Sequence, residues 1–571
     1  MISTLLNSVV RVYVGVLLIT YCFKDAETHR KLPRVCIKDG CLRGTWLKDP
    51  LLLNNSYAAF LGIPFAKPPV GDLRFKNPQP ADSYEGVYNA TTDKNACIQK
   101  APDIASSPVF GAEDCLYLNV FTPQNAYSPA SRPLPVMVYI HGGAYTVGSA
   151  RLSQLDPGRI ITTRKVVVVT LQYRLSVFGF FSTGDSSASG NYGLKDQVMA
   201  LRWVQDNIRA FGGNPRRVTI FGHSAGSGCT QFHMLSPLSR GLFHRVISMS
   251  GSALAKWSAP IPDPLSVART HGRILGIADA DSISTIELVE KFRGIDADIL
   301  THSIDRLKVW DIHLNAPYRP TVEPQDEPDA FLTEAPNTAW SHGKYASVDW
   351  LTGSIPADSS VFTQMVYRNE SLITDLNLRF TEILDLLLLT DISSKQLKRL
   401  RRRFLKTTPP DKWITPTNYD EVTTMLSEAG FLYPMIKSVK EHIQNRNQAR
   451  STSVYSFQFQ GRYSFSQILT GTNQSYGLTH SDQLIYLFRM PAIFPEFPPG
   501  SPEAEMCQLW VKFLVDFATK TNNKKEGTCT ALQCNVVTFG NTNNVYFPVN
   551  KTLVPGLDED LYQFWKKFYG E

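Results

Sequence analysis

Short apolar runs alternate with longer amphipathic stretches through the first half of the chain. Four of these runs predict buried strands: 134–143 (LPVMVYIHGG), 165–174 (KVVVVTLQYR), 216–227 (RRVTIFGHSAGS) and 244–252 (HRVISMSGS). Between the second and the third, residues 193–213 carry apolar side chains at roughly helical spacing and end in two glycines, which predicts a helix. Near-continuous β-branched runs separated by helices are typical of a large, mostly parallel central sheet flanked by helices.

The hydrophobic pattern changes in the second half of the chain. From about Leu265 to Ile468 it becomes helical and irregular. The length of 571 residues exceeds the size at which one core usually stops growing, which by itself favours two or more domains. A helical cap inserted into the same domain explains this length better than an independent second domain does. We therefore predict a single α/β domain over residues 24–571, with helical cap insertions at about 265–468.

The N-terminus has the pattern of a secretory signal. Arg11 precedes the apolar run 12–23, which is too short to span a bilayer comfortably and is followed by polar residues. We predict a signal peptide over about 1–23, with an uncleaved anchor as the alternative. The C-terminal end offers no second apolar span and no glycolipid-anchor signal. The protein is therefore expected to be secreted and extracellular, with no stable membrane anchor.

Asn-x-Ser/Thr sequons agree with passage through a glycosylating compartment. The predicted glycosylation sites are Asn54, Asn89, Asn369, Asn473 and Asn550. Nine cysteines are present, and cleavage after Cys22 would leave eight, an even number that suggests disulfides. Three pairs are close enough in sequence to close loops, although spacing leaves the pairing open: Cys36 and Cys41, Cys97 and Cys115, and Cys529 and Cys534. Cys229 is predicted to be a buried free thiol.

Composition and charge limit the kinds of partner. With 43% hydrophobic residues and a net charge of +7, the chain is predicted to be globular. Seven basic residues lie in 395–406 (KQLKRLRRRFLK), where a solvated helix face is expected and weak binding to a polyanion or membrane surface is the alternative. A secreted chain without a recognised nucleic-acid-binding module is not expected to bind nucleic acid.

The stretch FGHSAGS (221–227) carries the chemistry. A serine at the tip of a sharp turn between a strand and a helix has a strained backbone, and neighbours with side chains would collide with the strand or the helix. Glycines at Gly222 and Gly226 avoid that collision. G-x-S-x-G in this context is the nucleophile elbow of α/β-hydrolases, so Ser224 is predicted to be a nucleophile, with an ordinary turn serine as the alternative.

A serine nucleophile needs a base, an acid and an oxyanion site. The glycine loop HGGAY (141–145) follows an earlier strand, so the predicted oxyanion donors are the N–H groups of Gly143, Ala144 and Ala225. In this fold class the acid and the base follow the serine in that order. Asp358 follows a strand-like segment and is the predicted acid. His480 precedes an apolar helix-like run and is the predicted base.

The chain resembles the type-B carboxylesterases, the family that also holds the cholinesterases. The resemblance runs over nearly the whole mature chain, in the motifs YAAFLGIPFAKPPVGDLRFKNP (57–78), AEDCLYLNVFTP (112–123), HGGAYTVGS (141–149), GNYGLKDQVMALRWVQDNIRAFGGNP (190–215), FGHSAGS (221–227), SMSGS (248–252) and GLTHSDQLIYLF (477–488). It implies an α/β-hydrolase fold and the triad Ser224, Asp358 and His480. It also implies a disulfide between Cys97 and Cys115 and a supporting hydroxyl at Ser250.

Three departures from the family pattern surround the predicted acid and base. The acid is Asp358 where most members carry Glu, and Ser359 replaces the glycine that usually follows. Gln483 stands three positions after the base, where an acidic residue is expected, with Asp482 one place earlier. These changes make the acid the least typical member of the triad.

Further departures concern the walls of the pocket. Ala144 replaces a third glycine, and no tryptophan occurs between Cys97 and Cys115, where cholinesterases carry the aromatic residue that holds a quaternary ammonium. Trp257 or Trp310 is the candidate substitute. His223 precedes the nucleophile, where juvenile hormone esterases typically carry glutamine.

These residues predict a secreted serine esterase that hydrolyses small carboxylic esters through an acyl-enzyme, with no metal and no organic cofactor. A dedicated hormone esterase of the juvenile-hormone type is one alternative. A catalytically inactive, cholinesterase-like adhesion protein is the other. The sequence leaves the natural ester and the oligomeric state open.

Overall fold

The computed structural model describes residues 31–571 except 49–55, 101–106, 124–131, 311–315, 389, 445–450, 473–475, 521–534 and 542–548. Several predictions from the sequence lie outside the described residues: the signal peptide at 1–23, the sequons at Asn54 and Asn473, and the cysteines Cys529 and Cys534. Asn550 lies in a described strand, but its side chain is not described.

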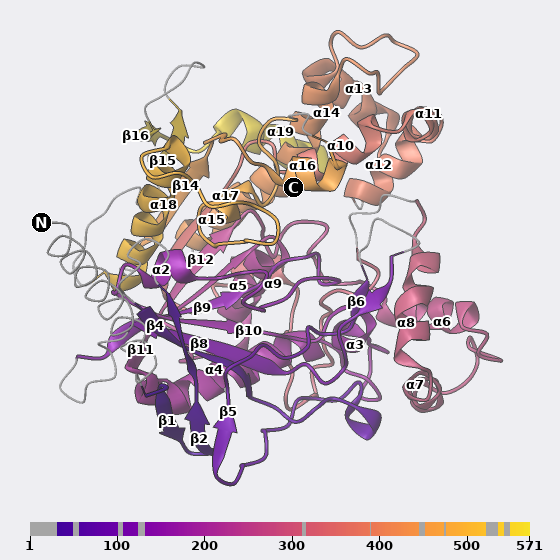
Figure 1. The fold of residues 1–571 in the computed structure, drawn as a ribbon. Coiled ribbons are helices and arrows are strands. Elements are labelled where there is room, and N and C mark those ends of the chain that lie inside the picture. Colours follow the sequence, from indigo (N-terminus) through magenta and orange to yellow (C-terminus); the bar gives the residue numbers. More distant parts are fainter. Residues whose placement is uncertain are drawn as a thin grey trace, which may run out of the picture.

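An eleven-stranded mixed sheet forms the centre of the molecule (Figure 1). In spatial order its strands are β16 (Val549–Pro555), β15 (Asn535–Asn541), β14 (Thr452–Phe457), β13 (Asp349–Ser354), β12 (Arg245–Met249), β11 (Gly213–His223), β9 (Leu134–Ile140), β10 (Val167–Leu171), β8 (Tyr117–Pro123), β4 (Ser56–Pro64) and β3 (Thr45–Lys48). Neighbours from β10 to β15 are parallel, and the outer pairs are antiparallel. The predicted mostly parallel sheet is confirmed, and its four predicted strands are β9, β10, β11 and β12.

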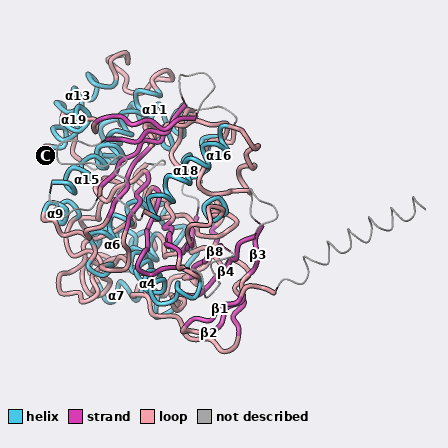
Figure 2. Tube along the Cα trace, turned by 90° about the vertical axis from the view of Figure 1, so that its left-hand side faces the viewer, coloured by secondary structure: helices cyan, strands magenta, loops and turns pink. Residues whose placement is uncertain are grey.

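The central strands are buried on both faces, because side chains alternate between two cores. In β9, Val136 and Val138 pack into one hydrophobic cluster, whereas Met137 and Tyr139 pack into the other. Helix α4 (Tyr192–Asn207), which fulfils the prediction for 193–213, covers the first face together with α5 (Ala225–Leu235). Helix α18 (Pro502–Thr519) covers the second face, and Figure 2 shows it across the strands from α15 (Tyr433–Gln444).

Shorter elements surround this framework. The small sheets contain β1 (Arg34–Ile37), β2 (Gly40–Arg43) and β5 (Val87–Asn89), and β6 (Gln99–Lys100) and β7 (Val109–Phe110). The remaining helices are α2 (Gly158–Ile161), α3 (Ser176–Phe180), α6 (Pro264–Ile274), α7 (Thr285–Arg293), α8 (Ala297–Ser303), α9 (Pro336–Ser341), α10 (Ser360–Tyr367), α11 (Glu370–Leu378), α12 (Phe380–Leu388), α13 (Ser394–Phe404), α14 (Tyr419–Ser427), α16 (Phe465–Thr470), α17 (Asp482–Ile485) and α19 (Glu559–Tyr569).

The region predicted as a helical cap, 265–468, is helical but not continuous. Helices α6 to α16 lie in it, and α11 to α14 form the upper right of Figure 1. The same interval also contributes β13 and β14 to the middle of the parallel sheet. Each is only six residues long and buried on both faces, so no regular alternation of polar and apolar residues marks it in a helical neighbourhood. Helices and sheet strands therefore alternate within this interval.

The basic stretch 395–406 coincides with α13. A capping box at Ser393 begins the helix, Leu400 and Phe404 are buried, and the Phe404 ring packs on Trp565 of α19. Lys395, Lys398, Arg402 and Lys406 are exposed. Other basic residues pack instead on aromatic rings, since the Arg401 guanidinium lies 4.2 Å from the centre of the Trp413 ring. The helix thus presents a basic face to solvent while part of its charge stabilises the cap.

The described cysteines divide into bridged and free ones. Cys36 pairs with Cys41, a pairing that the sequence left open. Cys97 pairs with Cys115, as the family resemblance implied. Cys229 and Cys507 are buried free thiols. The side chains of Asn89 and Asn369 are exposed, as a glycosylated asparagine must be. Among the described residues, no helix combines the length and apolar character needed to cross a membrane.

Candidate active site

Ser224 sits in a sharp turn between β11 and α5. Its φ of 58° and ψ of −125° lie outside the regions that residues with side chains normally adopt. A Cβ on Gly222 would lie 2.3 Å from the carbonyl oxygen of Gly226, and a Cβ on Gly226 would lie 2.1 Å from that of Ile140. The two glycines are thus required because the strand, the helix and the neighbouring strand β9 approach so closely.

The glycine loop after β9 lies against this turn. A Cβ on Gly142 would be 2.4 Å from the His223 carbonyl oxygen. Gly143 has a φ of 113°, and Ala144 takes the left-handed φ of 52° despite its side chain. Gly143 and Ala144 line the cavity beside Ser224, and Ala225 is the first residue of α5, where backbone N–H groups have no partner within the helix. The structure thus groups the three predicted donor residues around the serine.

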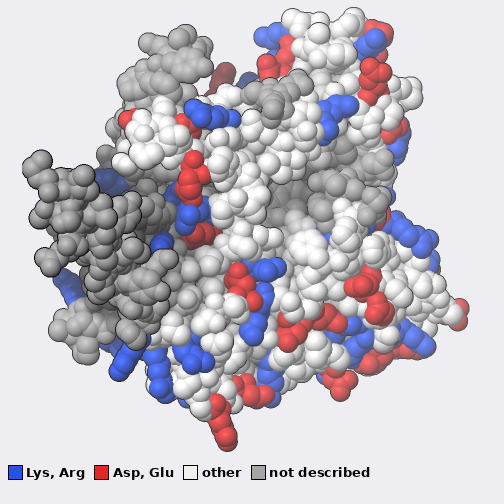
Figure 3. All heavy atoms as spheres, in the orientation of Figure 1, with Lys and Arg blue, Asp and Glu red and all other residues white. Residues whose placement is uncertain are grey.

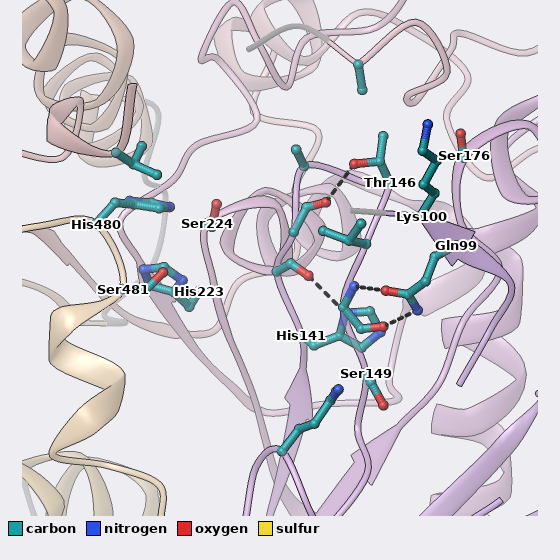
Figure 4. A pocket seen from close by; sticks show the side chains of 18 of the residues that line it. Gln99, Lys100, His141, Thr146, Ser149, Ser176, His223, Ser224, His480 and Ser481 are labelled. Carbon is teal, nitrogen blue, oxygen red and sulfur yellow. Dashed lines mark hydrogen bonds between the residues drawn. The ribbon is translucent and has the colours of Figure 1, made fainter. Parts of the chain in front are cut away.

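Gln99 holds the far end of the glycine loop. Its side-chain amide donates to the Gly148 carbonyl oxygen at 2.9 Å and accepts from the Gly148 N–H at 2.8 Å (Figure 4). Gln99 lies inside the loop closed by the Cys97–Cys115 disulfide, so this bridge supports the glycine loop through one side chain. No sequence motif distinguishes Gln99, so its contact with the glycine loop was not predicted.

Asp358 and His480 come together although 122 residues separate them in the chain. The distance from His480 Nδ1 to Asp358 Oδ1 is 2.7 Å, and Asp358 is fully buried. Burial raises the pKa of Asp358, while its hydrogen bond and charge interaction with His480 oppose that rise. Ser359 has a φ of −76°, so its position does not need the glycine that the family usually carries.

His480 and Ser224 line the same cavity, and Figure 4 shows the two side chains next to each other. The His223 ring lies 4.5 Å from the His480 ring, centre to centre. Burial, followed by the neighbouring His480, lowers the pKa of His223 well below the usual value. His223 is therefore an uncharged packing partner of His480.

Further buried polar side chains surround the Asp358 carboxylate. Ser250, which follows β12, hydrogen-bonds to Asp358 and accepts from Gln483 Nε2 at 2.7 Å. Tyr455 on β14 donates to Gln483 Oε1 at 2.9 Å. The structure thus places Ser250 where the family resemblance implied a supporting hydroxyl. Tyr455 was missed, because it looks like any buried aromatic residue of a strand.

Asp482 fixes the loop that carries His480. Its carboxyl group accepts from the N–H groups of Thr479 and Phe465, and from the Ser464 hydroxyl at 2.8 Å. Burial raises the pKa of Asp482 to about 7. The carboxyl group ties the start of α16 to the residue that precedes His480.

The cavity has a volume of about 480 Å³ and a largely apolar wall. Its apolar lining includes Leu155, Phe178, Trp257, Val361, Met365, Phe431, Phe465, Leu484 and Met490. Of the two tryptophans singled out from the sequence, Trp257 lines the cavity. Trp310 is not in its lining and instead donates to Asp375. Lys100 of the disulfide-closed loop also lines the cavity, paired with Asp305.

Charge is mixed on one face of the molecule. In the face shown in Figure 3, basic and acidic side chains are interspersed. Within the residues that the structure describes, no group of three His, Cys, Asp or Glu side chains is placed to hold a metal ion.

Comparisons with known proteins agree with this geometry. The profile of the carboxylesterase family matches residues 31–565. The chain is 35% identical to a juvenile hormone esterase of Tribolium castaneum over 482 residues, which cover 82% of this chain and 80% of that protein. It is 33% identical to esterase E4 of Myzus persicae, with 88% of this chain and 90% of the relative covered.

The fold is also similar to that of a solved structure. A crystal structure of the juvenile hormone esterase of Manduca sexta, with OTFP covalently attached, superposes with a TM-score of 0.81 at 25% identity. The match covers 95% of this chain and all of the other. The large mixed sheet with its flanking helices is therefore an α/β-hydrolase fold, as predicted.

Proposed function

Because the chain belongs to the carboxylesterase family and is a carboxylic ester hydrolase, we propose that it works through an acyl-enzyme formed on Ser224. The single observation that carries this proposal is the meeting of three features around one cavity. They are a strained serine between a strand and a helix, a histidine hydrogen-bonded to a buried carboxylate, and a glycine loop. Asp358 would hold His480 with its proton on Nδ1, which leaves Nε2 free to act as the base.

In the first half-reaction Ser224 Oγ bonds to the ester carbonyl carbon as His480 Nε2 takes the hydroxyl proton. The carbonyl oxygen becomes an oxyanion that accepts from the N–H groups of Gly143, Ala144 and Ala225. The bond to the alcohol oxygen then breaks, and His480 gives its proton to the leaving alcohol. In the second half-reaction water attacks the acyl-enzyme by the same steps, and the acid leaves.

The apolar cavity wall supports small uncharged esters as the substrate class. A dedicated juvenile-hormone-type esterase is the second candidate, favoured by the relatives from Tribolium and Manduca. His223 before the nucleophile weighs against it, because glutamine is typical there in those enzymes. The inactive adhesion alternative is disfavoured, because Ser224 and His480 line one cavity and His480 is hydrogen-bonded to the buried Asp358.

Secretion belongs to the same proposal. The N-terminal pattern at 1–23 and the sequons support passage through the secretory route, and Asn89 and Asn369 are exposed. Expression in a secreting cell should yield protein in the medium that gains mobility on a gel after glycosidase treatment. Protein retained in the cell without glycans would contradict this part.

The mechanism is tested by Ser224→Ala. Loss of the nucleophile should lower kcat on the order of 10⁶-fold without unfolding the protein. An organophosphate should label the wild type on Ser224 and leave the variant unlabelled. The measurement combines ester hydrolysis, mass spectrometry of the labelled peptide and circular dichroism. Substantial esterase activity in the folded variant would contradict the mechanism, and a panel of esters of varied acyl length would define the substrate.

A further inference from the structure

We propose that Gln483 is a positioning residue of the Ser224–His480–Asp358 site, acting through Ser250 to direct a hydroxyl proton at the Asp358 carboxylate. The proposal rests on the proposed function. It concerns the position where the family pattern expects an acidic residue and this chain carries an amide. Gln483 touches none of the reacting groups and acts on them through two hydrogen bonds.

The four side chains form one continuous chain of hydrogen bonds. Tyr455 donates to Gln483 Oε1 at 2.9 Å, and Gln483 Nε2 donates to Ser250 Oγ at 2.7 Å. Ser250 in turn hydrogen-bonds to Asp358, which also accepts from the Ile355 N–H at 3.3 Å and makes the 2.7 Å contact with His480. Relative exposure is 1% for Tyr455 and 0% for Ser250, Asp358 and Gln483, so bulk solvent does not reach these groups.

The charge on Asp358 gives every bond in this chain its direction. An ionised carboxylate only accepts hydrogen bonds, so the Ser250 hydroxyl must donate to it. The lone pairs of Ser250 Oγ are then left to accept, which requires a donor from residue 483. The amide supplies that donor, and its carbonyl oxygen accepts from Tyr455. Burial keeps Tyr455 protonated by raising its pKa, so it remains a donor.

A carboxylate at position 483 would reverse this order. It could only accept, so both the Tyr455 and the Ser250 hydroxyls would turn toward it and Asp358 would lose a donor. It would also add a third buried carboxyl group beside Asp358 and Asp482, where burial already raises both pKa values. The neutral amide avoids both effects, which explains why Gln483 suits this site.

The experiment compares the pH dependence of kcat/KM for the wild type and Gln483→Glu. The new carboxyl group adds negative charge, and it turns the Ser250 hydroxyl away from Asp358, which loses a hydrogen-bond donor. Both changes favour the protonated form of His480. The acidic limb of the profile should therefore move up by about one pH unit. As a matched control, Gln197→Glu makes the same change at a fully buried amide that bonds His233 and does not line the cavity. It should leave the limb in place.

A double-mutant cycle separates the effect of the hydrogen bonds that run from Gln483 through Ser250 to Asp358, here called the relay, from the effect of packing. Gln483→Met keeps the bulk, removes the donor and should lower kcat a few-fold. In a Ser250→Ala background it should have no further effect, because the amide acts only through that hydroxyl. Comparing Gln483→Met in the wild-type and Ser250→Ala backgrounds tests the relay even if Gln483→Glu does not fold. Equal losses in both backgrounds, or an unmoved limb in folded Gln483→Glu, would overturn the relay.

These outcomes are distinct from failure of the proposed function. A wild type that hydrolyses no ester and takes no organophosphate on Ser224 would overturn the mechanism and the relay together. The relay alone would be overturned by a different result. In that case the wild type is active and its kcat/KM depends on pH as expected for a histidine base, but the Gln483 variants do not shift the acidic limb of the profile.

Discussion

On one side of the cavity the turn at Ser224 and the loop after β9 take their shape from backbone packing, whereas on the other side Asp358 and His480 are held by side-chain hydrogen bonds. A Cβ on Gly226 would lie 2.1 Å from a backbone oxygen, so its turn tolerates no other residue. Asp358 and His480 depend instead on Ser250, Gln483 and Asp482. The turn at Ser224, called the backbone side, therefore needs residues without side chains. The Asp358–His480 pair, called the side-chain side, needs neighbours with the right hydrogen-bond donors and acceptors.

The largest expected effect on the side-chain side is that of Asp358→Asn. The amide cannot stabilise the imidazolium and favours the wrong tautomer of His480, so kcat should fall by up to about 10⁴-fold. Steady-state kinetics on a neutral ester measures it, with the fold checked by circular dichroism. If the variant keeps most of its activity, another carboxylate is the acid, and the hydrogen bonds around Asp358 do not position the catalytic histidine.

The corresponding test of the backbone side is Gly226→Ala. The added Cβ would meet the Ile140 carbonyl oxygen, which belongs to β9 and cannot turn aside. Helix α5 must move, which displaces Ser224 and the Ala225 N–H, and kcat should fall by about 10²-fold. Gly294→Ala is the matched control, because its Cβ would approach no atom closer than 3.6 Å. Equal kinetics for the two variants would contradict the packing argument.

A third prediction concerns how the stability that Asp482 contributes depends on pH. The folded-state pKa of Asp482 is about 7, above its ordinary value of 3.8, so the folded chain keeps a proton that the unfolded chain releases. The stability gained from this carboxyl group is complete below about pH 4 and is lost as the pH rises to about 7. The free energy of unfolding of the wild type, minus that of Asp482→Asn, should therefore fall by a few kcal/mol across that window. Urea titrations at several pH values measure it, and a constant difference would contradict the burial of this group.

The smallest effect concerns the substrate. The segment between Cys97 and Cys115 presents Lys100 to the cavity and no tryptophan, so a quaternary ammonium lacks the usual aromatic partner there. A neutral thioester should have a kcat/KM more than about tenfold above that of a thiocholine ester of matched acyl length. Both are compared at one ionic strength. Preference for the thiocholine ester would mean that the rings of Trp257 and Phe431 bind the quaternary ammonium in place of the missing tryptophan.

The sequence predicts the two sides of the site unequally. The turn at Ser224 and the glycine loop are local, so a strand followed by small residues reveals them. Asp358 and His480 were selected by chain order and by the strand and loop around each, and the structure brings them together. Tyr455 and Gln99 could not be selected, because their contacts are with residues distant in sequence and each looks ordinary in its own segment.

The strands β13 and β14 have a consequence for engineering the cap. Because both strands lie in the middle of the sheet, no single excision removes the helices of 265–468 and leaves the sheet whole. A cap grafted from a relative would have to be exchanged as three separate pieces, namely the helices before β13, those between β13 and β14, and α16 after β14. Asp358 lies just beyond β13 at the start of the second piece, so that junction would have to preserve the acid, whereas the first could be exchanged without touching it.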